Sequence, residues 1–355
     1  MKRRALTVFA GKEAAKRIQE LGWSAELFSL VVGASGGPKW FVLAHLDRLL
    51  FGDFLQRTDR SLTAVGSSIG AWRNACLAMP DPIAAIDALQ SGYLYQRFSR
   101  KPSTIEVSES SHQILRGILG ENGAHAIASN QRINTHIITA RGRGPAASSH
   151  KPLLATGMGA AALGNMLSRS LLKHLFQRVV FQSSSEPNSQ LSFDDFSTHF
   201  SSLEVSNVGA VLHASGAIPF VLTGERNIAG APVGQYWDGG IIDYHFDLSQ
   251  YRGQGLILYP HFSTSVIPGW FDKALPWRRA QLTQIEKLVL LCPSDEFVTQ
   301  LPHGKIPDRG DFGRMRYEER VRYWETCVAK SEALAADLAD LLEGKDPLAG
   351  VTVLN

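Results

Sequence analysis

Two short apolar runs of the chain each end in a glycine-rich turn and continue directly as a helix. Residues 27–32 lead into Gly33-Ala-Ser-Gly-Gly37, and residues 62–65 lead into Gly66-Ser-Ser-Ile-Gly70. A buried strand that passes through a tight turn into a helix is the repeating unit of parallel α/β sheets. This pattern constrains the fold more than any other feature of the sequence, and it predicts βαβ units.

The same alternation of apolar runs and helical patterns extends along the chain. We therefore expect an α/β fold, with a mostly parallel central sheet and helices on both faces in three layers. Apolar residues recur at three-, four- and seven-residue steps from Tyr317 to Leu342, which predicts one long amphipathic C-terminal helix that ends at Gly344. Further strands are expected at residues 5–9, 133–140, 256–259 and 288–291, and helices at residues 12–21, 38–50 and 71–79.

Composition excludes several classes of protein. The 36 basic and 33 acidic residues give a net charge of +3, and 44% of the residues are hydrophobic. These values exclude a disordered chain and argue against a nucleic-acid binder, which carries a large basic excess. The three cysteines form no CxxC pair, so we expect neither a disulfide framework nor a zinc site. We find no secretion signal and no spanning helix, and we expect a cytoplasmic protein, with peripheral membrane association left open.

The turn Gly66-Ser-Ser-Ile-Gly70 places a serine hydroxyl between a strand and a helix. Glycines two positions before and two positions after Ser68 leave room where the strand and the helix nearly touch. The N-terminus of the helix favours negative charge that develops at this point. Ser68 is therefore a candidate nucleophile. An ordinary βα turn in which Ser68 only caps the helix remains the alternative.

The earlier turn, from Gly33 to Lys39, can direct several backbone N–H groups toward one point. Such a loop suits an anion or an oxyanion. A phosphate-binding P-loop needs glycine before the lysine, but Pro38 precedes Lys39 and Trp40 follows it. A dinucleotide-binding GxGxxG pattern fails because Ser35 stands at its second glycine. An oxyanion loop and a plain turn both remain open.

Two further motifs complete a recognisable series. Ala214-Ser-Gly-Ala-Ile-Pro219 is a turn of small residues that allows close packing, and Asp238-Gly-Gly240 holds a carboxylate on a tight bend. In order along the chain, the four motifs resemble those of the patatin-like phospholipase family, over about residues 27–250. The loop departs from the family pattern, because Ser35 and Trp40 stand where that pattern has glycine.

The resemblance implies a role for each motif. Ser68 would be the nucleophile and Asp238 its partner in a catalytic dyad, as in the patatin-like proteins that the chain resembles. Residues 1–310 would form the α/β hydrolase domain, and residues 311–355 a helical extension packed on it. The remaining implied positions are Gly36 and Gly37 in the oxyanion hole, Gly66 and Gly70 in the nucleophile elbow, and Lys39, Gly239 and Gly240 as supporting residues.

The resemblance also implies the reaction. We expect a serine acyl-ester hydrolase, a phospholipase A or lysophospholipase, that acts on lipid esters without a cofactor or metal. Two alternatives remain open. One is an α/β-hydrolase whose triad uses His245 or His261, both of which follow Asp238 in the chain. The other is a lipid-binding module that kept the fold and lost turnover.

Two segments suggest contact with lipid. Residues 153–167 are uncharged and rich in small and apolar residues, and they suit either an acyl-chain cover or a buried helix. Residues 268–279 place Trp270, Phe271 and Trp277 beside three basic residues, a combination typical of membrane interfaces but also of ordinary packing. A transient membrane contact is therefore open, no nucleic-acid partner is expected, and the sequence does not indicate an oligomeric state.

Overall fold

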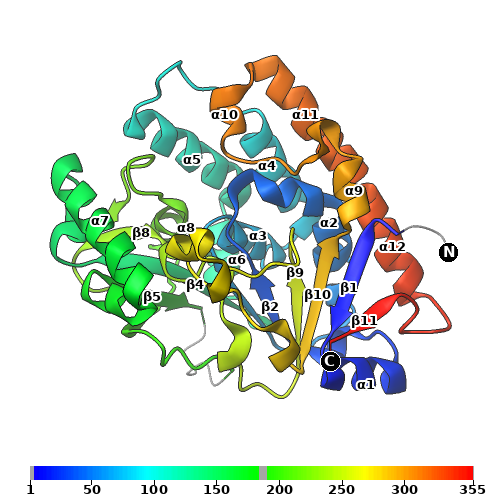
Figure 1. The fold of residues 1–355 in the computed structure, drawn as a ribbon. Helices are drawn as coiled ribbons and strands as arrows, with labels where there is room; N and C mark the ends of the chain where they lie inside the picture. Colours follow the sequence, from blue (N-terminus) through cyan, green and yellow to red (C-terminus); the bar gives the residue numbers. More distant parts are fainter. Residues whose placement is uncertain (1–3, 184–189, 355) are drawn as a thin grey trace.

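The computed structural model describes residues 4–183 and 190–354, and it is built around a sheet of eleven strands (Figure 1). Nine of them follow the order β11-β1-β10-β9-β2-β3-β4-β5-β6, while β8 pairs with β4 and β7 with β8. The strands are β1 Leu6–Ala10, β2 Phe28–Gly33, β3 Leu62–Ser67, β4 Ile133–Gly142, β5 Phe176–Gln182, β6 Thr198–Ser202, β7 Glu225–Arg226, β8 Gln235–Asp238, β9 Leu256–Pro260, β10 Leu288–Pro293 and β11 Val351–Val353.

The middle of the sheet is parallel. Strands β10, β9, β2, β3 and β4 pair in parallel with their neighbours, whereas β1 joins β10, and β5 joins β4, in antiparallel registers. Every residue of β3, β9 and β10 is buried, as expected for strands covered on both faces. The predicted α/β class with a mostly parallel central sheet is confirmed.

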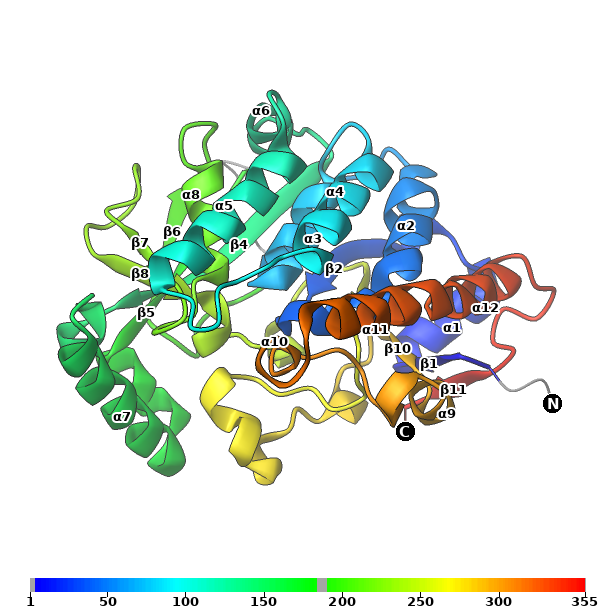
Figure 2. The same ribbon diagram turned by 90° about the horizontal axis from the view of Figure 1, so that it is seen from above.

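Helices surround this sheet (Figure 2). Helices α2, α3, α4 and α5 lie side by side along one side of it, α11 and α12 run nearly in line, and α7 lies at the end of the molecule beyond β5. The helices are α1 Lys12–Leu21, α2 Ala44–Gly52, α3 Ile69–Leu77, α4 Pro82–Leu94, α5 Thr104–Leu119, α6 Gly123–Ala128, α7 Lys151–Leu167, α8 Val208–Gly216, α9 Asp295–Thr299, α10 Asp311–Arg314, α11 Tyr317–Lys330 and α12 Glu332–Leu342.

The helix expected over residues 38–50 is in fact two elements. A 3₁₀ segment, η2 (Gly37–Leu43), precedes α2, and almost all of its residues are buried. Because Pro38 and the buried aromatic residues that follow it leave no polar face, this stretch lacks the amphipathic stripe of a surface helix. The prediction was right about helical character and wrong about a single α-helix.

The single C-terminal helix expected from Tyr317 to Leu342 is interrupted at Ser331. Its hydroxyl donates to the carbonyl of Val328 at 2.7 Å and lies 2.9 Å from Nδ1 of His45. A serine side chain that bonds to the backbone three residues earlier competes with helix continuation. Helix α11 therefore ends before Ser331, and α12 begins after it.

Residues 311–354 share the core of the rest of the chain. Trp324 of α11 packs on Phe41 with ring centroids 5.2 Å apart, and Leu338 of α12 belongs to the same buried cluster as the central strands. Strand β11 extends the sheet beside β1, and the sequence did not predict this strand. The division of the chain at residue 310 stays a prediction.

Helix α7, from the uncharged segment 153–167, is buried on one face only. Leu154, Met158 and Ala161 pack inward, whereas Leu163 and Leu167 are exposed. The alternative of a buried helix is therefore wrong for its C-terminal half.

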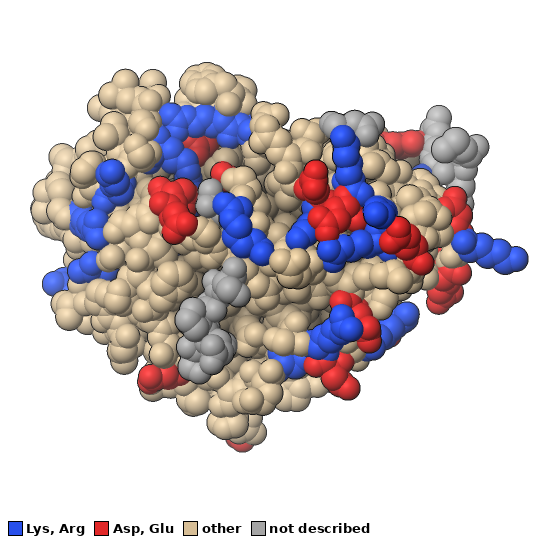
Figure 3. Space-filling view, turned by 90° about the horizontal axis from the view of Figure 1, so that it is seen from below, with Lys and Arg blue, Asp and Glu red and all other residues tan. Residues whose placement is uncertain are grey.

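Within the described ranges, no helix is both long and apolar enough to cross a bilayer. On the face that Figure 3 shows, basic and acidic side chains are interspersed among wide uncharged areas.

Candidate active site

The turn between β3 and α3 has the geometry of a nucleophile elbow. Ser68 adopts φ 54° and ψ −133°, a conformation rare for a residue with a side chain. The two glycines make this turn possible, because a Cβ on Gly66 would lie 2.6 Å from the Ala71 nitrogen and one on Gly70 would lie 2.0 Å from the Gly33 oxygen. The elbow therefore packs directly against the first glycine-rich loop.

Sheet register brings Asp238 to the same point. Strand β4 pairs with β3 along one edge, with Ser67 opposite Ile138, and β8 continues along that same edge, with Asp238 opposite Thr139, because β5 occupies the other edge. Asp238, at the end of β8, thus lies directly beyond the end of β3 on the same edge of β4. Ser68 and Asp238, 170 residues apart in the chain, become neighbours for this reason.

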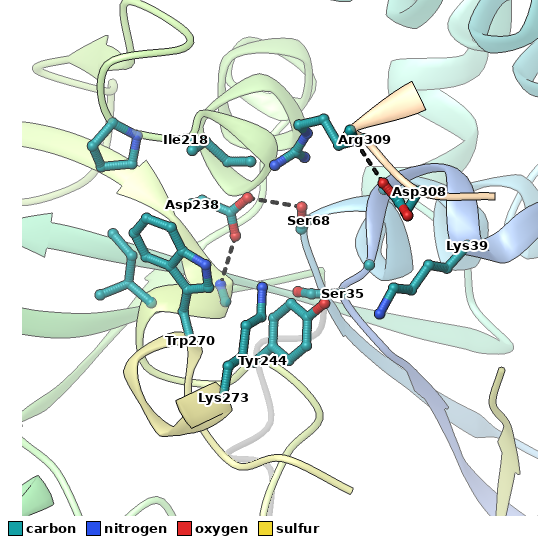
Figure 4. Close-up of a pocket in the computed structure, with 16 residues that line it drawn as sticks. Ser35, Lys39, Ser68, Ile218, Asp238, Tyr244, Trp270, Lys273, Asp308 and Arg309 are labelled. Carbon is teal, nitrogen blue, oxygen red and sulfur yellow. Dashed lines mark hydrogen bonds between the residues drawn. The ribbon is translucent and has the colours of Figure 1, made fainter. Parts of the chain in front are cut away.

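The two side chains form a hydrogen bond in a buried position (Figure 4). Oγ of Ser68 donates to Oδ2 of Asp238 at 2.8 Å, and only 5% and 6% of the two residues is exposed. The second carboxylate oxygen, Oδ1, accepts the N–H of Gly240 at 2.7 Å. Burial raises the pKa of Asp238, although the bonds from Ser68 and Gly240 and the nearby charges of Arg309 and Lys273 oppose this rise.

The glycines after Asp238 allow this close arrangement. A Cβ on Gly239 would lie 2.2 Å from the carbonyl oxygen of Ile138, and one on Gly240 would lie 2.8 Å from Oγ of Ser35. A side chain at Gly239 would therefore collide with the backbone of Ile138, and one at Gly240 with the side chains of Ser35 and Asp238. The Asp-Gly-Gly turn is therefore part of the packed centre of the protein and not a surface turn.

Ser215 of α8 also holds the elbow, and the sequence did not reveal this role. Its Oγ accepts the N–H of Ser68 at 2.9 Å and donates to the carbonyl of Ile138 at 2.7 Å. The small-residue turn 214–219 was expected only to allow close packing. The sequence gives no local sign of the bond, because β4, α8 and the elbow meet only in the fold.

Gly36 and Gly37 lie on the same cavity as Ser68. Gly37 has φ +57°, and the N–H groups of both glycines have no hydrogen-bond partner among the described residues. The preceding N–H, of Ser35, is occupied by the carbonyl of Tyr244 at 2.9 Å. Two unoccupied donors beside a serine suit an oxyanion. The unusual Ser35 is buried, and its Oγ lies 2.7 Å from Oγ of Ser67.

The cavity in front of the dyad has about 760 Å³ of space, its open mouth included. Lys39, Tyr244, Trp270, Lys273 and Arg309 also line it. A second cavity with about 720 Å³ shares Gly37, Ser68 and Arg309 with the first. The dyad therefore lies where the two cavities meet.

The family model for patatin-like phospholipases matches residues 55–245, more than half of the chain and including Ser68, the turn 214–219 and Asp238. The chain belongs to the patatin-like phospholipase family. This membership places it among the lipid acyl hydrolases. Among solved structures, VipD from Legionella pneumophila is similar over 99% of this chain and 75% of its own, with 13% identity and a TM-score of 0.37. No curated protein matches the sequence.

The two histidines of the alternative triad do not contact the dyad of this patatin-like protein. Nδ1 of His245 accepts the N–H of Ile267 at 3.0 Å, and Nδ1 of His261 accepts the N–H of Ser263 at 2.9 Å. Within the described part of the chain, neither histidine bonds to Ser68 or Asp238, and neither lines the two cavities. Burial lowers the pKa of His261 to about 3 and that of His245 well below its usual value, so both rings are neutral.

One group of side chains in the patatin-like protein could hold a metal ion. Ligand atoms of His112, His213 and Glu225 lie within 4.8 Å of one another. Nδ1 of His213 is 2.6 Å from Oε1 of Glu225, and the two imidazole rings stack with centroids 3.9 Å apart. None of the three lines either cavity. The sequence did not single out this group.

Proposed function

We propose that this chain hydrolyses acyl esters of phospholipids or lysophospholipids, with Ser68 as nucleophile and Asp238 as its general base. The observation that carries the proposal is the 2.8 Å bond from Oγ of Ser68 to Oδ2 of Asp238 at the junction of the two cavities. A base must lie within hydrogen-bond reach of the proton that it accepts, and this carboxylate does.

The reaction would proceed in two steps. Asp238 takes the hydroxyl proton while Oγ of Ser68 attacks the ester carbonyl, and the alcohol then leaves with that proton as the C–O bond breaks. Water subsequently attacks the acyl-enzyme and gives its proton to Asp238, which passes it to Oγ of Ser68 as the Oγ–acyl bond breaks and the fatty acid leaves. The burial that raises the pKa of Asp238 makes this carboxylate a stronger base than a solvated one.

The loop before η2 would stabilise the tetrahedral intermediate. Gly36 and Gly37 line the same cavity as Ser68, and their N–H groups have no other partner within the residues described. Removal of one donor of this kind typically costs about 3 kcal/mol of transition-state stabilisation. Lys39 follows on the same loop and also lines the cavity, so it adds positive charge near the oxyanion.

A serine-directed fluorophosphonate probe tests the proposal. The wild type should label at Ser68, Ser68→Ala should not label, and Asp238→Asn should label far more slowly. Ser249→Ala and Asp247→Asn, at exposed positions close by in the chain, are the matched controls. A panel of acyl esters then identifies the hydrolysed class. A folded wild type that does not label would support the alternative of an inactive lipid-binding module.

The pH profile separates the dyad from the triad. A Ser-Asp dyad predicts no histidine step in kcat/KM near pH ~6.5. A step there that disappears when His245 or His261 is replaced would favour the triad.

We also propose a transient membrane contact beside the cavity. Asn165 of α7 donates to Asp272 of η8 (Trp270–Ala274) at 2.7 Å, which joins the exposed end of α7 to a wall of the cavity. Leu167 and Trp277 are 82% and 72% exposed there. Leu167→Glu should weaken co-sedimentation with phospholipid vesicles, whereas Leu21→Glu, at the distant end of α1 where the leucine is also exposed, should not.

A further inference from the structure

Three basic side chains from distant parts of the chain converge on the cavity in front of the dyad. Lys39 belongs to η2, Lys273 to η8, and Arg309 precedes α10. Figure 4 shows their charged ends directed into the space around Ser68 and Asp238. All three positions lie outside residues 55–245, which the family model matches.

Aromatic rings, and not carboxylates, hold the two lysines. Nζ of Lys273 lies 3.9 Å from the ring centroid of Tyr244, and Nζ of Lys39 lies 5.1 Å from that of Phe262. Among the described residues, neither lysine nor Arg309 forms an ion pair. Such cation–π contacts fix the position of an ammonium group without neutralising it.

The nearest carboxylates leave an excess of positive charge in the cavity. Asp308 lines the same cavity, but its Oδ2 is 3.0 Å from Nζ of Lys305 and 3.8 Å from the guanidinium of Arg314. Asp238 is the other carboxylate near Lys273, and it is engaged by Ser68 and Gly240. Two anionic groups, one of them already paired, therefore face three cations.

The cations are close enough to repel one another. Loss of solvation, together with the charges of Lys39 and Arg309, lowers the pKa of Lys273 to about 7, although the side chain remains accessible from the open cavity. Like charges brought together without counter-charges are unfavourable. A bound anion would relieve this repulsion.

The second cavity offers a different environment on the other side of Ser68. Trp72, Tyr93, Phe98, Val221, Leu222 and Phe312 contribute to its lining, and it lies between α3, α5 and α10. Arg309 lies at the border between the two cavities, close to Gly37. A Cβ built on Gly37 would lie 3.3 Å from Nη2 of Arg309 and 3.2 Å from the hydroxyl of Tyr93. Ser68 thus separates an apolar cavity from a cationic one.

We propose that Lys39, Lys273 and Arg309 form a binding subsite for an anionic group, a phosphate ester, on the alcohol part of the substrate. The acyl chain occupies the apolar cavity, and the scissile carbonyl lies between the two at Ser68. The subsite deepens the proposed function and rests on it for the position of the ester bond. Arg and Lys are the usual partners of phosphate in proteins, Arg through its planar fork of donors and Lys as a point charge.

Binding to the Ser68→Ala variant tests the subsite without turnover. The ligands are decyl phosphate, decyl glucoside as a neutral amphiphile of the same chain length, and inorganic phosphate, each titrated calorimetrically below its micelle concentration. We expect decyl phosphate to bind at least about 10-fold tighter than either of the other two, since hydrogen bonds to charged groups contribute about 1.5–3 kcal/mol.

Two substitutions identify the residues. In the Ser68→Ala background, Lys273→Met and Arg309→Met should each weaken decyl phosphate binding about 10-fold and leave decyl glucoside binding unchanged. Lys16→Met, on an exposed face of α1, is the control and should change neither affinity. Circular dichroism and the Tm of each variant establish that it is folded.

The outcomes distinguish this proposal from the proposed function. Equal binding of decyl phosphate and decyl glucoside, or retained phosphate preference in both folded methionine variants, overturns the subsite. Preferential binding of decyl phosphate by a protein that hydrolyses no ester would sink the proposed function and leave the subsite. Ester hydrolysis without any preference for a charged ligand would overturn the subsite and leave the proposed function.

Discussion

The protein treats its basic side chains in two different ways. In the core, Arg73 and Arg178 are about 1% exposed, and each forms a two-point ion pair with a buried aspartate. At the cavity, Lys273 and Arg309 have no ion pair within the residues described. A buried charge must be paired to be tolerated, whereas a charge beside an open cavity is solvated until a ligand arrives. The paired arginines therefore serve the fold, and the unpaired cations serve binding.

Two aspartates of one turn repeat this contrast. Asp243 binds Nε of Arg178 at 2.6 Å and Nη2 at 2.8 Å, and these contacts raise the pKa of Arg178 despite its burial. Asp238, five residues earlier, forms no ion pair among the described residues, and burial raises its pKa. The first carboxylate is engaged in a two-point ion pair with a buried guanidinium. The second is the group that accepts a proton in the proposed function.

The largest expected effect concerns activity without loss of stability. Ser68→Ala and Asp238→Asn should each lower kcat by about 10⁴-fold, because they remove the nucleophile or its base. Neither should lower the Tm, since Asp238 is an unpaired buried carboxylate whose neutral replacement keeps the shape. Ester hydrolysis and thermal unfolding measure the two effects. A marked fall in Tm for Asp238→Asn would break the distinction between the two aspartates.

Substitution of Asp243, five residues after Asp238, should have the opposite effect, a loss of stability without a specific loss of activity. Asp243→Asn leaves Asp195 as the carboxylate partner of the buried Arg178 guanidinium among the described residues, with Oδ1 of Asp195 2.8 Å from Nη1. Removal of one member of a buried ion pair typically costs about 3–5 kcal/mol. We expect a loss of this size in the free energy of unfolding, measured in urea, with kcat reduced only in proportion to the folded fraction. If the Asp243→Asn variant were stable but inactive, Asp243 would instead have a role in catalysis.

The third effect is a pH dependence confined to charged substrates. As pH rises, kcat/KM should first increase as Asp238 loses its proton. For a phosphate-bearing ester, kcat/KM should then fall by about 10-fold above pH 7, where Lys273 becomes neutral. The groups that face Lys273 are Lys39, Arg309, Asp238 and Tyr244.

Three comparisons check the assignment of that falling limb. A neutral ester should show no fall, Lys273→Met should abolish it, and Lys16→Met should retain it. Because a bound anion raises the pKa of Lys273, the fall in kcat should lie at higher pH than the fall in kcat/KM. A falling limb of equal size with the neutral ester would mean that another group titrates.

Local sequence patterns predicted the strands of the sheet and indicated Ser68 and Asp238 as candidate residues. The runs at residues 256–259 and 288–291 match β9 and β10 because buried strands are continuous apolar segments. Ser68 and Asp238 stand in glycine-flanked turns that the chain needs for tight packing, and they lie together as expected. Their catalytic role stays a prediction.

What the sequence did not reveal depends on contacts between distant segments. Lys273 lies in the short 3₁₀ segment η8 and Arg309 in a turn, and only the folded chain places them on the same cavity as Ser68. The bond from Ser215 to the elbow and the pairing of β11 with β1 are likewise non-local. The break at Ser331 was missed because apolar periodicity continues across it, while the cause is one side-chain hydrogen bond.

The smallest expected effect is a gain in stability at the cavity. Because the pKa of Lys273 in the folded protein is about 7 and its unfolded value is near ~10.4, the folded state binds fewer protons between these values. Wild-type stability should therefore rise with pH across this window, and Lys273→Met should remove the rise. The side chain is accessible and partly screened, so we expect the Tm of Lys273→Met to exceed that of the wild type by only about 2 °C at pH 6, with no difference at pH 10.

Saturating decyl phosphate should raise the Tm of the wild type more than that of the variant. A variant less stable than the wild type at pH 6 would show that Lys273 serves the fold, as the buried arginines do.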